Sequence, residues 1–292
     1  MYWEKYYFAQ SIEETLELLK HYEGDARIMA GGTDLMVQFK YNYLSAKVMV
    51  DIGRIKELNH IRQENGHVSI GATTTHTALA TSPYLQKHFQ VLANGVKTIG
   101  SPQIRNAGTI GGNVANAQPA ADGSIALVAL GATICGISPD GPFSRPIEST
   151  FLNPGECALN STAELITSFT LPAPGPRDRS AFVRHSRRAA LALPIMNMGL
   201  WLRLNEEEDG IEDARIAIGP MARVPFRAKQ TEAFLRGAKL SEAVLDEAGE
   251  LTFEEVSPRD SFRGSAAYKK ELVRVYLKRA VLEAVGERSV GR

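Results

Sequence analysis

Two glycine-rich segments carry residue types that could bind a phosphate-bearing ligand. The first, MAGGTDL, covers residues 29–35, and the second, GSPQIRNAGTIGGNVANAQPAAD, covers residues 100–122. Glycines let the backbone approach a ligand closely, and successive backbone N–H groups in such turns form anion-binding concavities. Taken alone, the first segment fits a structural turn better than a ligand site. The second interleaves its glycines with Ser, Gln, Asn and Thr, which suits a large polar cofactor with phosphates and sugar hydroxyls.

The common signatures of nucleotide and hydrolase sites are absent from the sequence. It contains no Gly-x-Gly, no Gly-Lys, no His-Glu-x-x-His and no Gly-x-Ser-x-Gly. The six histidines are scattered without the spacing of metal ligands, so we expect no metal site in this chain. Cys135 and Cys157 are too few to bind an iron–sulfur cluster, and we expect both to be buried as small apolar groups.

Composition excludes further classes of function. The 292 residues include 33 basic and 33 acidic side chains, so no general basic field favours nucleic acid or an anionic membrane surface. No apolar run approaches the roughly 18–20 residues that span a bilayer, and the first residues do not resemble a signal peptide. We therefore expect a cytoplasmic protein without membrane insertion.

The first glycine-rich segment follows a predicted strand. A capping-box pattern at residues 11–14 begins a helix that should end near Gly24. Residues 27–30 are mostly apolar and lead directly into the glycines, and residues 48–52 and 67–72 also resemble strands. The sequence therefore predicts a small α/β unit over roughly the first sixty residues.

The second segment lies between predicted helices and strands. Helices are predicted at 75–82, 83–98 and 124–130, and strands at 132–137 and 165–171. Three prolines and a glycine within residues 172–180 indicate a connection, where we place the main domain boundary. Beyond it, strands are predicted at 195–204 and 211–219 around a hairpin tip at 205–210, and a final helix at 266–285.

Four motifs, in order, resemble those of the FAD-binding subunit or middle domain of the molybdenum hydroxylases, the xanthine dehydrogenase and aerobic carbon monoxide dehydrogenase family. AGGTDL resembles the family's first pyrophosphate loop, and QIRNAGTIGGNVANAQPAAD its second flavin loop. ARIAIGPMARVPFRA at 214–228 and DSFRGSAAYKKEL at 260–272 resemble its C-terminal domain. The similarity covers about residues 1–285.

The resemblance implies an α+β fold. Residues 1–175 would form a two-lobed FAD-binding domain of the vanillyl-alcohol oxidase type, with lobes at about 1–58 and 59–175. Residues 176–292 would form a smaller α/β C-terminal domain of the carbon monoxide dehydrogenase flavoprotein type. The flavin would lie between the two lobes.

The resemblance also assigns cofactor-binding residues. The first loop would wrap the pyrophosphate, the second the phosphates and ribityl chain, and Asp122 would bind the ribose of the adenosine half. Further flavin contacts are assigned by a looser alignment at Ile166 and Arg184. The full set is Ile28, Ala30, Gly31, Gly32, Thr33, Asp34, Leu35, Gly100, Ile104, Gly108, Thr109, Gly111, Gly112, Asn113, Asn116, Asp122, Ile166 and Arg184.

The implied activity is electron transfer without a catalytic acid or base on this chain. A large partner would carry a molybdopterin-bound molybdenum centre and a small partner two [2Fe–2S] clusters. FAD on this chain would receive the electrons and pass them to NAD⁺ or another acceptor. The small number of cysteines disfavours relatives such as 4-hydroxybenzoyl-CoA reductase, whose flavin subunit has an extra iron–sulfur insertion. A stand-alone flavin dehydrogenase and a flavin-free assembly subunit remain the alternatives.

One position departs from the family pattern. Many relatives have an acidic residue before the apolar run that follows the paired arginines. Here Arg187 and Arg188 precede AALALPIM, with Ala192 near that position. This face would border the isoalloxazine ring, so the change leaves open how the ring is tuned and which acceptor reaches it. The arginine pair fits a solvated or interface charge pair better than a site.

Overall fold

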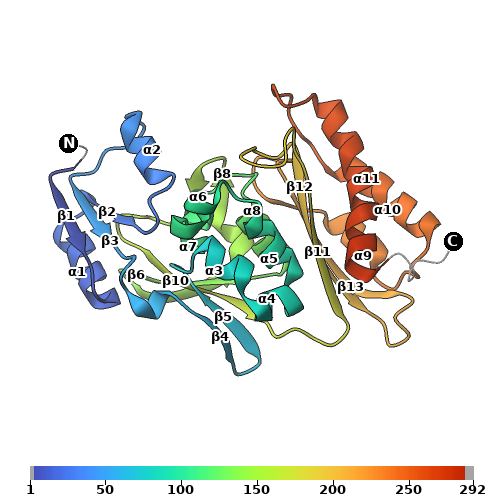
Figure 1. The fold of residues 1–292 in the computed structure, drawn as a ribbon, viewed down its shortest axis with the longest axis horizontal. Helices are drawn as coiled ribbons and strands as arrows, with labels where there is room; N and C mark the ends of the chain where they lie inside the picture. Colours follow the sequence, from blue (N-terminus) through green and yellow to red (C-terminus); the bar gives the residue numbers. More distant parts are fainter. Residues whose placement is uncertain (1–2, 287–292) are drawn as a thin grey trace.

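The computed structural model describes residues 3–286, arranged as three successive units along the long axis of the molecule (Figure 1). No helix within this range is long and apolar enough to cross a membrane. The same range contains no group of three or more His, Cys, Asp or Glu side chains placed to hold a metal ion. Cys135 and Cys157 are free thiols, but they are half-buried rather than buried as predicted.

The N-terminal unit is a small parallel sheet of order β1-β3-β2, with a helix packed against it. Its elements are β1 (Lys5–Phe8), α1 (Ile12–His21), β2 (Ala26–Met29), α2 (Leu35–Lys40) and β3 (Val48–Asp51). Ser11 caps α1 as predicted, since its Oγ accepts from the Glu14 amide at 3.1 Å, but the Glu14 carboxylate accepts from the Gln10 amide at 2.7 Å instead of the Ser11 amide of a capping box. β2 ends at Met29, so the first glycine-rich segment leaves the carboxyl end of a parallel strand.

The middle unit is a five-stranded antiparallel sheet of order β4-β5-β10-β6-β7, with helices packed against it. Its strands are β4 (Ile61–Glu64), β5 (His67–Gly71), β6 (Thr133–Ser138), β7 (Gly141–Pro146) and β10 (Leu165–Pro172). Its helices are α3 (His76–Thr81), α4 (Pro83–His88), α5 (Gln90–Lys97), α6 (Pro102–Ala107), α7 (Ile110–Ala115) and α8 (Asp122–Ala129). Short elements complete it: η1 (Lys56–Leu58), η2 (Ile147–Thr150), β8 (Phe151–Asn153) and β9 (Glu156–Cys157).

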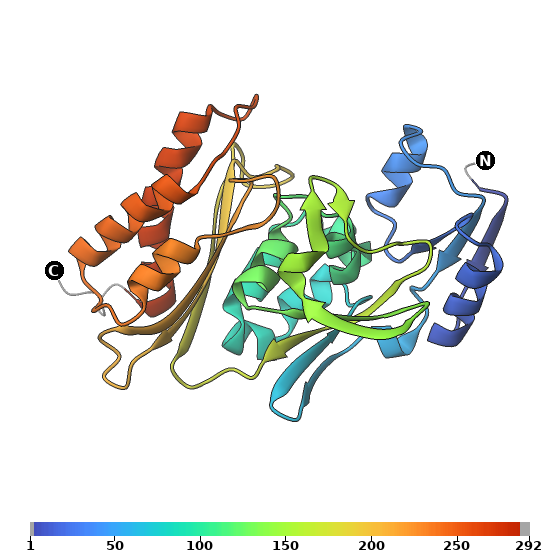
Figure 2. The same ribbon diagram turned by 180° about the vertical axis from the view of Figure 1, so that it is seen from behind.

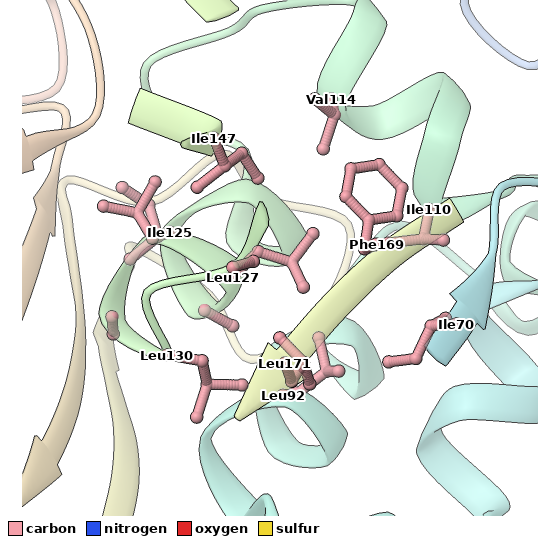
Figure 3. Packing of buried hydrophobic residues seen from close by; sticks show 14 of the residues in the cluster. Ile70, Leu92, Ile110, Val114, Ile125, Leu127, Leu130, Ile147, Phe169 and Leu171 are labelled. Carbon is pink, nitrogen blue, oxygen red and sulfur yellow. The ribbon is translucent and has the colours of Figure 1, made fainter. Parts of the chain in front are cut away.

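The core of the middle unit lies between its sheet and its helices. Phe169 and Leu171 of β10 and Ile70 of β5 pack with Leu92 of α5 and Leu127 of α8 (Figure 3). Every residue of α8 is buried. A helix apolar on all sides needs covering on all sides, and the third unit supplies the missing cover.

The C-terminal unit is an antiparallel sheet of order β11-β12-β13-β14, followed by three helices. Its elements are β11 (Asp178–His185), β12 (Met196–Leu204), β13 (Ile211–Gly219), β14 (Phe226–Arg227), α9 (Lys229–Leu235), α10 (Glu242–Glu255) and α11 (Ala266–Val285). Helices α5 and α8 cover one face of this sheet, and α9 and α11 the other (Figures 1 and 2). Because both faces are buried, β12 is apolar along nearly its whole length instead of alternating.

Three local predictions differ from the structure. The helix predicted at 83–98 is two helices, because Phe89 leaves the helical region between α4 and α5. The connection predicted at 172–180 is shorter, since β10 ends at Pro172 and β11 begins at Asp178 to pair with β12. The second glycine-rich segment contains two short helices, α6 and α7, instead of continuous turns.

Candidate functional site

The first glycine-rich segment presents unpartnered backbone donors. Gly32 has a φ of +67°, in the left-handed region that favours glycine, and α2 begins three residues later. Within residues 3–286, the backbone N–H groups of residues 31–34 donate to no protein group. Such adjacent free donors form a concavity suited to an anion. The segment can therefore bind a phosphate through its backbone without a lysine.

The second segment is held mainly by hydrogen bonds of its own. Thr109 caps α7 by accepting from the Gly112 amide at 3.2 Å, and the Gly111 amide donates to the Ala72 carbonyl at 2.8 Å. Most of its backbone N–H groups are thus engaged in hydrogen bonds within the protein. What it offers a ligand is chiefly the side-chain amides of Asn113 and Asn116. We infer that the two segments have different roles, the first donating from its backbone and the second from its side chains.

The two segments meet directly across a cleft between the N-terminal and middle units. A Cβ on Gly31 would overlap the carbonyl of Ala107, so only glycine permits this approach. Asn116 faces the N-terminal unit, where its Oδ1 accepts from Gln38 Nε2 at 3.4 Å, whereas the Oδ1 of Asn113 accepts from the Ser124 amide at 3.0 Å. Most of the sequence-predicted residues line this cleft: Ile28, Ala30, Gly31, Gly32, Thr33, Asp34, Leu35, Ile104, Gly108, Thr109, Gly112, Asn113 and Asn116.

Further residues line the cleft outside the predicted set of cofactor-binding residues. They are Arg27, Met29, Gln38, His76, Ile99, Ala115, Gly155 and Ser161. Gly155 and Ser161 come from the chain on either side of β9, and no sequence signal connects them with the glycines. Ile99 directly precedes the second glycine-rich segment, which is the one signal for it in the sequence. Because it combines free backbone donors with both polar and apolar lining residues, the cleft suits a cofactor that has a pyrophosphate and an apolar ring, as FAD has.

The comparisons with known proteins agree with this geometry. Residues 3–174 match the family model described as the FAD binding domain in molybdopterin dehydrogenase, and residues 181–284 the CO dehydrogenase flavoprotein C-terminal domain. The chain belongs to this flavoprotein family. It is 32% identical to the glyceraldehyde dehydrogenase medium chain of Sulfolobus acidocaldarius, covering 95% of this chain and 97% of that one.

Two further comparisons extend the likeness over the whole flavoprotein. The nicotinate dehydrogenase FAD-subunit of Eubacterium barkeri is 30% identical, with 97% of this chain and 96% of that one covered. A solved structure of carbon monoxide dehydrogenase from Hydrogenophaga pseudoflava superposes with a TM-score of 0.90 at 29% identity, covering 97% of both chains. The predicted fold class, a FAD-binding domain followed by a flavoprotein C-terminal domain, is thereby confirmed.

Five predicted cofactor residues of the flavoprotein do not line the cleft. Gly100 has a φ of +48° and packs against the side chain of Ile104, which does line the cleft. Gly111 packs against Ala72, and Ile166 belongs to the hydrophobic core. Asp122 and Arg184 face each other where the middle and C-terminal units meet. Their assignment to the flavin stays a prediction.

Asp122 is the centre of a buried polar cluster between two units. It accepts from Asn197 Nδ2 at 2.6 Å, and Arg184 Nε lies 3.4 Å from the same carboxylate oxygen. Burial raises the pKa of Asp122, and the charge of Arg184 and the hydrogen bond from Asn197 oppose that rise. Arg184 also donates to the Ala192 carbonyl, so this cluster holds the 186–194 loop, where the chain departs from the family pattern.

Removal of Arg184 should destabilise the fold. In Arg184→Met the Asp122 carboxylate stays buried without its cation, and breaking a buried pair costs about 3–5 kcal/mol. We expect the free energy of unfolding at pH 7.5, measured by urea titration, to fall by about 3 kcal/mol. Arg187→Met, at an exposed position in the same loop, is the control and should change it by less than about 0.5 kcal/mol. Equal stabilities of the two variants would contradict the role of the pair.

Three titratable groups that line the cleft, Arg27, Asp34 and His76, have shifted pKa values, and burial lowers the pKa of Arg27. Burial raises the pKa of Asp34, and hydrogen bonds with Asn116 and Thr33 oppose the rise. A more easily protonated carboxyl is less unfavourable beside an anionic cofactor. Burial, together with the nearby charge of Arg105, lowers the pKa of His76 to about 4. His76 is therefore neutral at physiological pH.

The low pKa of His76 predicts acid sensitivity. As pH falls from about 6.5 to about 4, the unfolded chain binds a proton that the folded chain does not, so stability is lost across this window. The full loss is about 3 kcal/mol for this group, at 1.36 kcal/mol per pKa unit. Urea titrations of the wild type and His76→Gln at pH 7.5, 5.5 and 4.5 should show a steeper decline for the wild type. Parallel declines would contradict the shifted pKa.

Proposed function

We propose that this chain is the electron-transfer flavoprotein of a molybdenum hydroxylase complex. A small partner with [2Fe–2S] clusters would deliver electrons that originate at a molybdopterin centre on a large partner. The chain would pass them to NAD⁺ or another acceptor. The observation that carries the proposal is the cleft between two glycine-rich segments, with its row of unpartnered amides at residues 31–34.

The types of residue that line the cleft support binding of FAD. Free amides of the first segment would bind the pyrophosphate, and Asn113 and Asn116 would donate to the neighbouring oxygens. Bound FAD would supply the chemistry, because a flavin accepts single electrons from clusters and releases a pair to a hydride acceptor. The chain itself binds and orients the cofactor and excludes water, so no side chain is needed as a general acid or base.

The partners follow from the relatives and from the composition of this chain. Relatives are named as medium chains or FAD subunits, which implies companions. Residues 3–286 offer no cluster of metal ligands, so the molybdenum and iron–sulfur centres would belong to other chains. We propose a FAD-binding domain at 1–175, a C-terminal domain at 176–292 and a cytoplasmic location. The 186–194 loop, with Ala192 in place of an acidic residue, would face the acceptor.

Purification of the native complex tests this proposal. The chain should copurify with a large molybdenum protein and a small iron–sulfur protein, with about one FAD per copy. A yellow chain that purifies alone and oxidises a small donor by itself would instead support a stand-alone flavin dehydrogenase. A colourless chain that gains no FAD on reconstitution would support an assembly subunit without flavin.

A further inference from the structure

His76 lies in the wall of the cleft without a hydrogen-bond partner for its ring. It is the first residue of α3, follows the capping residue Thr75, and is only 3% exposed. Within the described part of the chain, neither ring nitrogen forms a hydrogen bond, and Nδ1 is buried and unsatisfied. Buried polar atoms of native proteins are almost always paired, so an unpaired one calls for an explanation.

The ring is oriented toward the second glycine-rich segment. Its Cδ2–Nε2 edge lies against Gly108, where a Cβ would be 3.1 Å from Cδ2 and 3.3 Å from Nε2. Both residues line the cleft. A glycine at position 108 therefore leaves room beside Nε2 in the wall of the cleft.

Packing alone does not require an imidazole here. The hydrogen bond that ties α3 to the second segment runs from the His76 backbone N–H to the Gly108 carbonyl, at 3.0 Å, and any residue except proline would supply it. An apolar ring of the same size would fill the space without burying unsatisfied nitrogens. The imidazole is thus less favourable than an apolar ring unless a ligand bonds Nε2, the nitrogen beside Gly108, and offsets part of the cost.

The neutral ring has a preferred tautomer in this setting. A proton on Nε2 leaves Nδ1 as an unpartnered acceptor, which is less costly than an unpartnered buried N–H donor. The Nε2–H group would then face the cleft as a donor. Phosphate and ribityl oxygens of a flavin nucleotide can accept such a bond, and the low pKa of His76 keeps the ring in this neutral form.

We propose that His76 Nε2–H donates a hydrogen bond to an oxygen of the pyrophosphate–ribityl segment of bound FAD, next to Gly108. This inference rests on the proposed function, and adds a side-chain donor on α3 to the two glycine-rich segments. His76 is in this sense a residue that selects and positions the cofactor, and it takes no part in electron transfer.

The test compares FAD binding by full-length chains. His76→Phe keeps the ring volume and removes both nitrogens, whereas His76→Gln restores an N–H donor. We expect the Kd for FAD, from flavin fluorescence quenching, to rise about tenfold to a hundredfold in His76→Phe and to stay within about threefold in His76→Gln. His67→Phe, on the exposed end of β5, is the matched control and should leave the Kd unchanged.

A second measurement uses the wild type alone and does not depend on how a variant folds. Addition of FAD to ¹⁵N-histidine-labelled chain should shift the Nε2 resonance of His76 and leave that of His67 in place. Binding of FAD with an unmoved His76 resonance, or a folded His76→Phe variant with wild-type affinity, overturns this inference and leaves the proposed function intact. Failure of the wild type to bind FAD overturns both.

Discussion

The Gly112→Leu variant is expected to purify as a folded protein that binds no FAD. Apart from its chain neighbours and the backbone of α7, a Cβ at this position would meet only Thr109 Oγ1, at 3.1 Å. Because Gly112 lines the cleft, the remainder of the leucine would extend into it and occupy the space of the cofactor. Leucine also has a higher helix propensity than glycine, so α7 should persist. The Kd for FAD should rise at least about a hundredfold.

The control for this variant is a glycine away from the cleft. Gly249 lies in α10, where a Cβ would make ordinary contacts with Arg274 at 3.4 Å, so Gly249→Ala should retain both fold and FAD. Gly31 is less informative, because a side chain there would overlap Ala107 and disturb the meeting of the two segments themselves. FAD content and circular dichroism separate loss of cofactor from loss of fold. Wild-type FAD content in Gly112→Leu would refute the assignment of the second segment.

The first segment could be predicted because its signals are local. A short apolar run precedes the glycines, and β2 indeed ends at Met29, directly before them. The second segment was identified by composition, but its helices were not, because glycine and asparagine are poor helix formers. Those helices depend on caps and tertiary contacts: Ser101 and Thr109 cap α6 and α7, and Gly111 packs on Ala72.

The spacing of residues in the sequence does not predict roles that depend on partners far away along the chain. The resemblance assigns Asp122 to the cofactor, which stays a prediction, but no spacing in the sequence indicates its hydrogen bond with Asn197, 75 positions away. His76 was one of six scattered histidines, and its position in the cleft arises from its backbone bond with Gly108. A possible signal was the hydroxyl run directly before it, Thr73 to Thr75, which marks the start of α3.

The strands of the C-terminal unit are only partly predictable from the sequence, because one of them depends on contacts with distant residues. The strands now seen as β12 and β13 were predicted, because their apolar runs and the polar tip between them are local features. β11 is not predicted: its first three residues, which are polar and follow three prolines, fall in the predicted connection at 172–180, and no element is predicted for the rest of it. It becomes a strand by pairing with β12 along eight residues and by covering α5.

The largest functional effect is expected in a reconstituted complex that contains Gly112→Leu. If electrons leave only through this chain, the molybdenum and iron–sulfur centres will still be reduced by substrate, because their own chains are unchanged. Reduction of NAD⁺ or the natural acceptor should then fall at least about a hundredfold. A one-electron dye that oxidises the clusters directly should restore substrate turnover. Two measurements on one preparation test this: the spectra of the clusters report their reduction by substrate, and the rate of acceptor turnover reports electron transfer out of the complex.

The comparison with Gly249→Ala makes this experiment specific to the flavin. Both variants remove one glycine, but only residue 112 lines the cleft, so a general weakening of assembly would affect the two complexes alike. Persistent acceptor reduction in the flavin-free complex would mean that electrons leave by another chain. Loss of cluster reduction as well would mean that Gly112 acts on assembly. Only the selective loss of acceptor reduction agrees with a chain whose contribution is to hold FAD between a one-electron donor and its acceptor.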